Sequence, residues 1–261
     1  MEKNPKKPIT FILSTGRTGT QFFSKYLTET CAHTLCLHEP KPSRRFKWYS
    51  NFYLTGKLSK KFIASQYFNK RKSILQHRDY NQYIESSNFL FGCVEPILTQ
   101  TPDLAVLHIV RHPLTYVRSH LNKGYWSGIK GFTARNIPGW MEYIEPGIKK
   151  TKDPVLILLA RWIYVNKIIL SYQDNIKYML VRFEDLFGGA AANPVEQLNA
   201  VRGFIGHQPL DEQTQQSWLK KSANKSRTNL AEKWPVEQKH LAYINENGAD
   251  LLQLFDYKID V

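Results

Sequence analysis

An apolar run that ends in a glycine-containing loop, FILSTGRTGTQFF, lies close to the start of this 261-residue chain. The run from Ile9 to Leu13 predicts a buried strand, and the apolar side chains after the loop recur at helical intervals. A strand, a tight loop and a helix in this order direct free backbone N–H groups and the positive end of the helix dipole to one point. The segment therefore predicts a β-loop-α unit with an anion site, although an ordinary βα turn has the same outline.

The rest of the chain continues this alternation. Further strands are predicted at Thr34–His38, Asn88–Val94, Leu104–Val110 and Lys177–Phe183. Helices are predicted within 58–68, from Pro113 onward, and at Val155–Tyr172, Pro194–Ile205 and Val236–Leu254. The pattern predicts an α/β fold, a single domain over residues 1–261 with a roughly five-stranded, mainly parallel sheet flanked by helices. Ligands of such sheets bind at the carboxyl ends of the strands.

The chain is strongly basic, with 36 Lys and Arg against 22 Asp and Glu and a net charge of +14. The segment from Pro40 to Arg78 contains no acidic residue. Such a field attracts anions, including nucleotides, acidic glycans, nucleic acid and anionic membranes, and does not choose among them. A run of charged residues most often forms a solvent-exposed face, and we predict such a face for this segment.

Neither export nor membrane insertion is predicted. The charged N-terminus MEKNPKKPIT precedes only a short apolar run, which is unlike a signal peptide. Arg161, Asn166 and Lys167 interrupt the most apolar helix, so we expect a buried core helix and no transmembrane segment. The three cysteines are too few for a disulfide framework and suit a reducing compartment, so we expect a cytoplasmic protein.

The strand predicted at Leu104–Val110 is followed by a cation. A nucleotide triphosphatase often ends such a strand in an acidic residue that helps to hold magnesium, and its loop carries a lysine. This chain has Arg111 at the strand end and no lysine in the loop, which indicates a phosphate site without a metal. Ser119 follows about two helical turns later and can converge with Arg111 on one phosphate. Taken alone, the pair is more typical of a surface salt bridge and a solvated hydroxyl than of a phosphate site.

Together these motifs resemble the superfamily of sulfotransferases that depend on 3′-phosphoadenosine 5′-phosphosulfate (PAPS), whose fold is similar to that of the P-loop NTPases. FILSTGRTGTQFF looks like the 5′-phosphosulfate loop of the family, and LHIVRHPLTYVRSHL looks like its 3′-phosphate motif. LVRFEDLFGGAAANPVEQLNAVRGFIG resembles its later strand, acidic pair and helix. The matches occur in the family's order and span most of the chain. His112 replaces the Asp that is more usual after the motif's Arg.

The resemblance implies which residues bind the donor. The 5′-phosphosulfate would be held by Arg17, Thr18, Gly19, Thr20 and Gln21. Arg17 has the place of a family Lys or Arg near the leaving phosphate, which gives it a catalytic role as well. The 3′-phosphate would be held by Arg111 and Ser119. A C-terminal stretch that matches the family only loosely would close over the nucleotide with Asn224, Ser226 and Arg227.

Several residues are candidates for the general base, which must take the proton of an acceptor hydroxyl. Glu39 and His38 end the second predicted strand, beside the phosphate loop in the expected topology. Glu39 is preferred, although it can equally pair with a nearby cation. Glu95, taken to follow the third strand, is a further candidate, whereas Glu184 and Asp185 are expected to cap a segment or brace the sheet.

The predicted function is transfer of a sulfuryl group from PAPS to an acceptor hydroxyl or amine, by in-line displacement and without a metal. The acceptor is left open as a small molecule, glycan or lipid that can be anionic, and the glycine- and aromatic-rich segment 122–154 is expected to be a mobile acceptor loop. One alternative is a P-loop nucleotide kinase or NTPase. The other is a basic nucleic-acid-binding module, which is not favoured because no such motif occurs.

Overall fold

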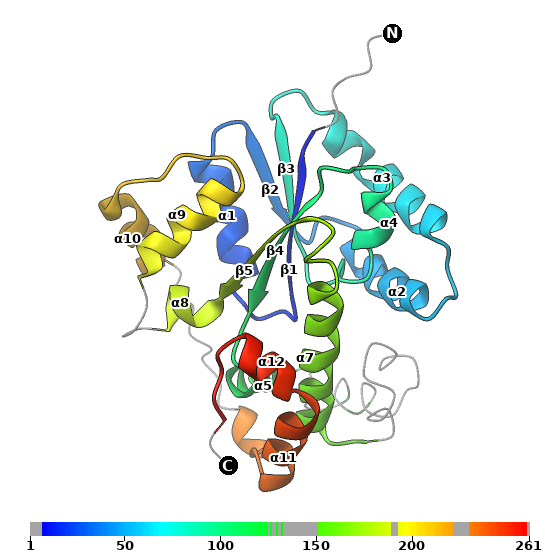
Figure 1. Cartoon of the computed structure of the whole chain (residues 1–261), viewed down its shortest axis with the longest axis vertical. Helices are drawn as coiled ribbons and strands as arrows, with labels where there is room; N and C mark the ends of the chain where they lie inside the picture. Colours follow the sequence, from blue (N-terminus) through cyan, green and yellow to red (C-terminus); the bar gives the residue numbers. More distant parts are fainter. Residues whose placement is uncertain are drawn as a thin grey trace.

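The structure is a computed structural model that describes residues 7–124, 126, 129, 132, 151–188, 193–221 and 230–259. Its centre is one five-stranded sheet in the order β2-β3-β1-β4-β5, and every neighbouring pair is parallel (Figure 1). The strands are β1 (Ile9–Ser14), β2 (Thr34–His38), β3 (Gln82–Ser86), β4 (Ala105–Val110) and β5 (Lys177–Arg182). The predicted α/β domain with a parallel sheet is confirmed.

The third strand differs from the prediction. The segment Asn88–Val94 is not a strand: it turns after β3 and enters the short helix α4 (Val94–Leu98). The segment is apolar because Leu90 and Phe91 are buried in the core. Ser50 Oγ accepts a hydrogen bond from the Gly92 N–H and so stabilises the turn. The true strand, QYIES, carries the charged Glu85, which obscures an apolar signal. A buried charge at Glu85 is tolerated only because it forms an ion pair with Arg71, which lies in a different element.

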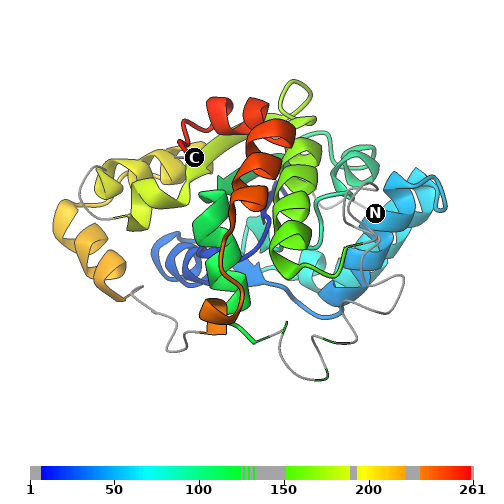
Figure 2. The same ribbon diagram turned by 90° about the horizontal axis from the view of Figure 1, so that it is seen from below.

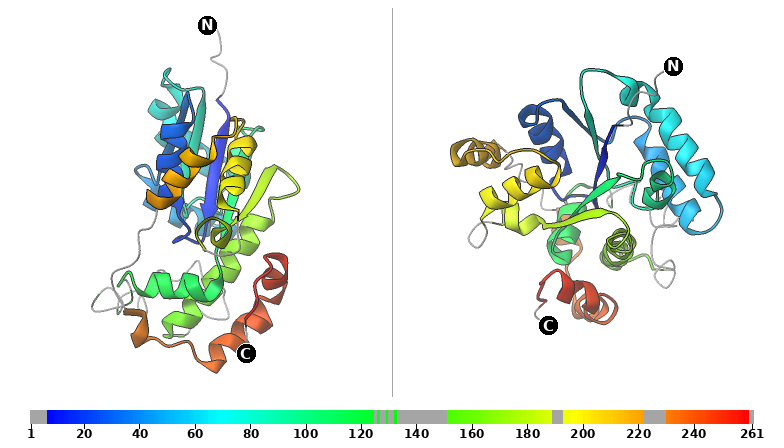
Figure 3. Two further views of the ribbon diagram at one scale, coloured as in Figure 1. Left: turned by 90° about the vertical axis from the view of Figure 1, so that its left-hand side faces the viewer. Right: turned by 45° about the horizontal axis from the view of Figure 1, so that its top comes forward.

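Helices cover both faces of the sheet, as the right-hand view of Figure 3 shows. One face carries α1 (Thr20–Thr30), α8 (Phe183–Phe187), α9 (Pro194–Phe204) and α10 (Glu212–Lys221). The other carries α2 (Ser43–Leu54), α3 (Lys60–Gln76), α4 and part of α7 (Pro154–Leu170). The alternation along β1 explains both layers, because Phe11 packs into the second face and its neighbour Ile12 into the first.

A third cluster lies beyond the carboxyl ends of β4 and β5. It joins α5 (Pro113–Leu121) and α7 to η2 (Leu230–Lys233), α11 (Gln238–Asn247) and α12 (Ala249–Leu254). In Figure 2, α11 and α12 lie beside α7, whereas η2 lies beside α5. The single helix predicted at Val236–Leu254 is therefore two helices. They meet at Gly248, where a side chain would be 2.8 Å from Ile244. Among the described residues, no helix is long and apolar enough to cross a membrane.

Because all five strands are parallel, their carboxyl ends share one edge of the sheet. The loop 15–19 follows β1, Glu39 follows β2, Ser87 and Asn88 follow β3, and Arg111 follows β4. The helix α5, which begins immediately after Arg111 and His112, carries Ser119 beside the same edge. The fold therefore gathers most of the sequence-predicted residues at one place.

Candidate functional site

The loop after β1 turns through three residues in the left-handed region, with φ of 91° at Gly16, 61° at Arg17 and 78° at Gly19. Gly19 is the N-cap of α1, and the Gly16 N–H donates to Ser14 Oγ at 3.0 Å. Glycine adopts this conformation without strain, whereas Arg17 adopts it at a cost of about 1–2 kcal/mol. A non-glycine residue held this way at a helix N-terminus is a mark of a binding loop.

Arg17 links the loop to the predicted 3′-phosphate residues. Its Nε donates to Ser119 Oγ at 3.2 Å, and its carbonyl oxygen accepts from Arg111 Nη1 at 2.7 Å. These contacts join residues that lie 102 and 94 positions apart in the chain. The structure thus brings Arg17, Arg111 and Ser119 together, as the two motifs predict.

Arg111 is held by its surroundings in one orientation. Its Nε donates to Thr115 Oγ1 at 3.1 Å, and its guanidinium lies 4.2 Å from the centre of the Phe183 ring. Burial lowers the pKa of Arg111, Glu184 opposes that shift and Arg17 adds to it, yet an arginine remains protonated at neutral pH. Two adjacent guanidinium groups at the sheet edge make a strongly positive site.

Buried polar atoms without a hydrogen-bond partner in the described part of the chain gather around the loop. They are Thr15 Oγ1, Thr18 Oγ1, Asn88 Oδ1 and His120 Nε2. A Cβ placed on Gly16 would lie 2.8 Å from Asn88 Nδ2 and 3.6 Å from His120 Nε2, so these two side chains crowd the loop. An unsatisfied buried polar atom costs about 1–3 kcal/mol, and two of these are hydroxyls that can donate to phosphate or sulfate oxygens. The residues present therefore fit a phosphosulfate group.

Besides Asn88, two site residues were not predicted from the sequence. Arg161 of α7 is buried and its Nη2 donates to the Thr15 carbonyl oxygen at 3.4 Å. His120 lies on α5, and burial holds its pKa well below the usual range, with Arg161, Arg17 and Arg111 acting in the same direction. The sequence did carry one signal, because Arg161 is one of two cations that interrupt the most apolar helix.

Glu39 lies at the same sheet edge but is separated from the loop by β3. Ser86, the last residue of β3, bridges the two: its carbonyl accepts the Glu39 N–H at 2.9 Å, and its Oγ donates to the Thr20 carbonyl at 3.0 Å. Burial raises the pKa of Glu39, and the charges of Arg44 and Arg161 oppose that shift. A half-buried carboxyl with a raised pKa and cations nearby has the character of a general base.

His38 ends β2 and is half-buried. Its Nδ1 is buried without a partner among the described residues. Burial lowers the pKa of His38, and the nearby Ser86 backbone opposes that shift. The imidazole is therefore neutral at pH 7 and remains an alternative base.

Glu95 does not follow a strand, and that prediction is wrong. It lies in the first turn of α4, where it accepts from Tyr53 OH at 2.5 Å and pairs with Lys60. The bonds from Lys60 and Tyr53 lower the pKa of Glu95. Its carboxylate is committed to these partners and is a poor candidate for the base.

Glu184 braces the strand ends, as expected. Its carboxylate accepts the His112 N–H at 3.0 Å and the Tyr257 hydroxyl at 2.6 Å. His112, which replaces the more usual Asp, also contacts the Lys258 carbonyl at 3.1 Å. This second residue of the motif is therefore turned toward the C-terminal segment.

The remaining predicted residues are less well placed or undescribed. Gln21 lies in the first turn of α1 with an exposed side chain. Asn224, Ser226 and Arg227 lie outside the described residues, as does most of the segment 122–154. Within the described ranges, no group of three or more His, Cys, Asp and Glu residues is arranged to hold a metal ion.

No protein-family model matches the chain, and no curated protein matches it by sequence. Solved structures do. The sulfotransferase STF9 from Mycobacterium avium aligns with a TM-score of 0.63 and 12% identity, over 98% of this chain and 79% of that one. The sulfotransferase domain from the curacin biosynthetic pathway aligns with a TM-score of 0.54 and 15% identity, over 97% and 99%. Identity this low establishes the fold alone, and the chain therefore has the fold of the sulfotransferases.

Proposed function

We propose that this protein is a sulfotransferase that moves the sulfuryl group of PAPS to a hydroxyl or amine of an acceptor. The observation that carries the proposal is the double contact of Arg17, with Ser119 through its side chain and with Arg111 through its carbonyl. It joins a phosphate-binding loop to a strand-end arginine and a helix serine. A donor with a 5′-phosphosulfate and a 3′-phosphate has anionic groups for both parts.

In this proposal the loop residues Arg17, Thr18, Gly19 and Thr20 hold the 5′-phosphosulfate, with Gln21 at the start of α1. Arg111 and Ser119 hold the 3′-phosphate, and Asn224, Ser226 and Arg227 close over the nucleotide. The donor, when bound, supplies an activated sulfuryl group on a phosphate leaving group. Backbone N–H groups of the loop and the Arg17 guanidinium stabilise the charge that develops on that phosphate.

Glu39 is proposed as the general base. Its carboxylate takes the proton of the acceptor as the new oxygen–sulfur bond forms and the bond from sulfur to the phosphate oxygen breaks. The raised pKa of Glu39 supports this role, because a base works best when its pKa lies near the working pH. Neutral His38 is the alternative.

The acceptor is proposed to be a small molecule, glycan or lipid, with the segment 122–154 as an acceptor loop. Arg44 and Arg45, both exposed on α2 after the Glu39 turn, favour an anionic acceptor. The three cysteines are free and buried, which supports a reducing, cytoplasmic setting. A nucleotide triphosphatase is not favoured, because the loop has no lysine and β4 is followed by an arginine.

Ligand-induced thermal stabilisation tests the donor site. We expect the desulfated product, 3′-phosphoadenosine 5′-phosphate (PAP), to raise the melting temperature well beyond AMP at equal concentration, because binding to the native state stabilises it by mass action. Equal shifts would count against a 3′-phosphate site, and a shift that requires magnesium and ATP would favour the kinase alternative. Labelled PAPS then identifies the acceptor by transfer of the label.

A further inference from the structure

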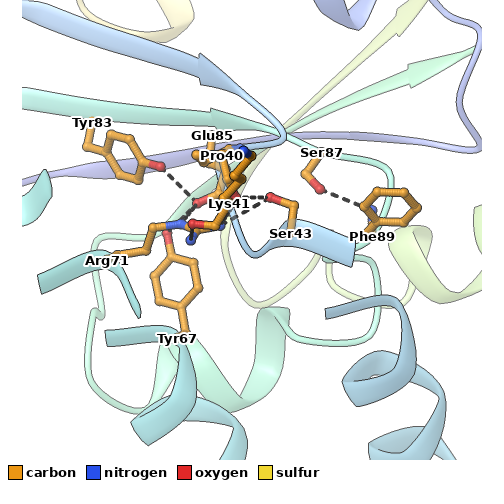
Figure 4. A network of polar contacts seen from close by, with 9 residues as sticks. All are labelled: Pro40, Lys41, Ser43, Tyr67, Arg71, Tyr83, Glu85, Ser87 and Phe89. Atoms are coloured by element: carbon orange, nitrogen blue, oxygen red, sulfur yellow. Dashed lines mark hydrogen bonds and ion pairs between the residues drawn. The ribbon is translucent and has the colours of Figure 1, made fainter. Parts of the chain in front are cut away.

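A fully buried ion pair lies beneath the turn that carries Glu39 (Figure 4). Arg71 of α3 binds Glu85 of β3 through two bonds, from Nε to Oε2 at 2.8 Å and from Nη2 to Oε1 at 2.7 Å. Both side chains are completely buried. Tyr83 OH and Tyr67 OH also donate to Glu85 Oε2, at 2.9 and 3.3 Å, so the carboxylate is well satisfied.

The Arg71 guanidinium also donates hydrogen bonds to the residues that follow Glu39 in the chain. Nη2 donates to the Pro40 carbonyl at 3.0 Å and to Ser43 Oγ at 3.2 Å, and Nη1 donates to the Lys41 carbonyl at 3.1 Å. Figure 4 shows these groups converging on Arg71 from the turn, while Glu85 approaches from the sheet. One buried side chain thus fastens this turn to β3.

Glu39 needs such support, because its φ of 45° is in the left-handed region. A non-glycine residue is held there only when its surroundings over-determine the conformation. The Ser86 carbonyl holds the Glu39 N–H, and Arg71 holds the carbonyl of the next residue, Pro40. The conformation is therefore fixed on both sides of Glu39.

Stability alone is a weak reason for this arrangement. Burying two charges costs several kcal/mol per ion, and buried ion pairs are often no more stabilising than apolar residues of similar volume. What a guanidinium provides and an apolar side chain cannot is a rigid set of donors for backbone carbonyls.

We propose that Arg71 is a positioning residue of the reaction: paired with Glu85, it holds the turn that presents the Glu39 carboxylate to the acceptor. This inference rests on the proposed role of Glu39 as the base. Arg71 is itself completely buried, so in this proposal it acts on the reaction through the turn.

A double-mutant cycle between Arg71 and Glu39 tests the inference. Arg71→Lys keeps the charge but cannot reproduce the fork of donors. We expect turnover of labelled PAPS, with water or the acceptor identified by label transfer as nucleophile, to fall about 10- to 100-fold, because small misplacements of reacting groups cause losses of this size. PAP affinity should stay within about twofold, because the Arg71 guanidinium donates to Glu85 and to the turn 40–43, which lie outside the loop 15–19. In the Glu39→Gln background, Arg71→Lys should cause no further loss.

The controls separate this inference from a structural role and from the proposed function. Lys60→Gln removes an exposed ion pair from the same helix and should change neither turnover nor PAP binding. If Arg71→Lys folds poorly, Ser43→Ala removes a single partner of Arg71 and should give a smaller loss, again absent in Glu39→Gln. Losses that multiply in the double variant, or a crystal structure of Arg71→Lys with Glu39 unmoved, would overturn the inference. Unchanged turnover in Glu39→Gln alone would instead refute the proposed base.

Discussion

At the scale of single residues, the site depends on side chains that each serve two purposes. Arg17 offers its guanidinium to Ser119 and its carbonyl to Arg111, so a change at one residue is felt by the others. Glu39 combines a strained backbone with a raised pKa. In the proposed reaction, residues with this double role couple binding to chemistry, and matched substitutions can separate the two.

Arg111→Ala should weaken PAP binding by about 1.5–3 kcal/mol, the usual value of a charge-assisted hydrogen bond, which corresponds to about 10- to 150-fold in affinity. Titration calorimetry measures the affinity for PAP directly. Arg118→Ala is the control, because Arg118 is exposed on the same helix α5. Equal affinities in the two variants would remove Arg111 from the donor site.

Glu39→Gln should keep PAP affinity near that of the wild type and lower turnover by about 10²–10⁴-fold, the usual contribution of a general base. The substitution keeps the shape of the side chain and removes its basicity. His38→Ala should lower turnover less. The reverse ranking would transfer the role to His38, and melting temperatures of both variants show whether the fold is intact.

At the scale of elements, the loop between β1 and α1 owes its shape to glycine. Gly16→Ala places a methyl group 2.8 Å from Asn88 Nδ2 at a φ of 91°, so it adds both crowding and backbone strain. Gly56 has a φ of 74° and open space around it, so Gly56→Ala adds strain alone. We expect Gly56→Ala to lose about 1–2 kcal/mol in urea unfolding and Gly16→Ala to lose more, and only Gly16→Ala to lose PAP-induced stabilisation. Full PAP stabilisation of Gly16→Ala would show that this crowded side of the loop is not the donor site.

At the scale of the whole molecule, buried histidines should make the fold sensitive to acid. His108 of β4 contacts Tyr178 OH at 2.7 Å and Asn166 Oδ1 at 2.9 Å, and burial lowers its pKa to about 4. Above pH 6.5, His108 is neutral in both the folded and the unfolded chain. As the pH falls toward 4, only the unfolded chain takes up the proton, so stability is lost over that window.

Because of this lowered pKa, the protonation of His108 in the unfolded chain should reduce the free energy of unfolding by about 2 kcal/mol when the pH falls from 7 to 5. Urea unfolding at pH 7 and at pH 5 measures this difference in the free energy of unfolding. His108→Gln should show a smaller loss between the two pH values, whatever its stability at pH 7. His77→Gln, at an exposed histidine, should retain the wild-type difference. An unchanged difference in His108→Gln would show that other groups account for the acid sensitivity.

Local patterns in the sequence were sufficient for much of this molecule. β1, β2, β4 and β5, the loop between β1 and α1, and the long apolar helix were predicted near their observed bounds, because each is defined by the periodicity of its own residues. The two motifs that resemble phosphate-binding sequences also follow from local sequence. A strand end and the helix after it determine that Arg17, Arg111 and Ser119 lie at the carboxyl edge of the sheet.

Other features required the tertiary structure, since their partners are distant in the chain. β3 was missed because Glu85 resembles a surface charge until Arg71 of α3 is placed against it. Arg161 and Asn88 reach the loop only through the packing of α7 and the turn after β3. The position of Glu39 relative to the loop depends on the strand order, which inserts β3 between them. Periodicity reports which face of an element is buried, whereas only packing decides which charges meet there.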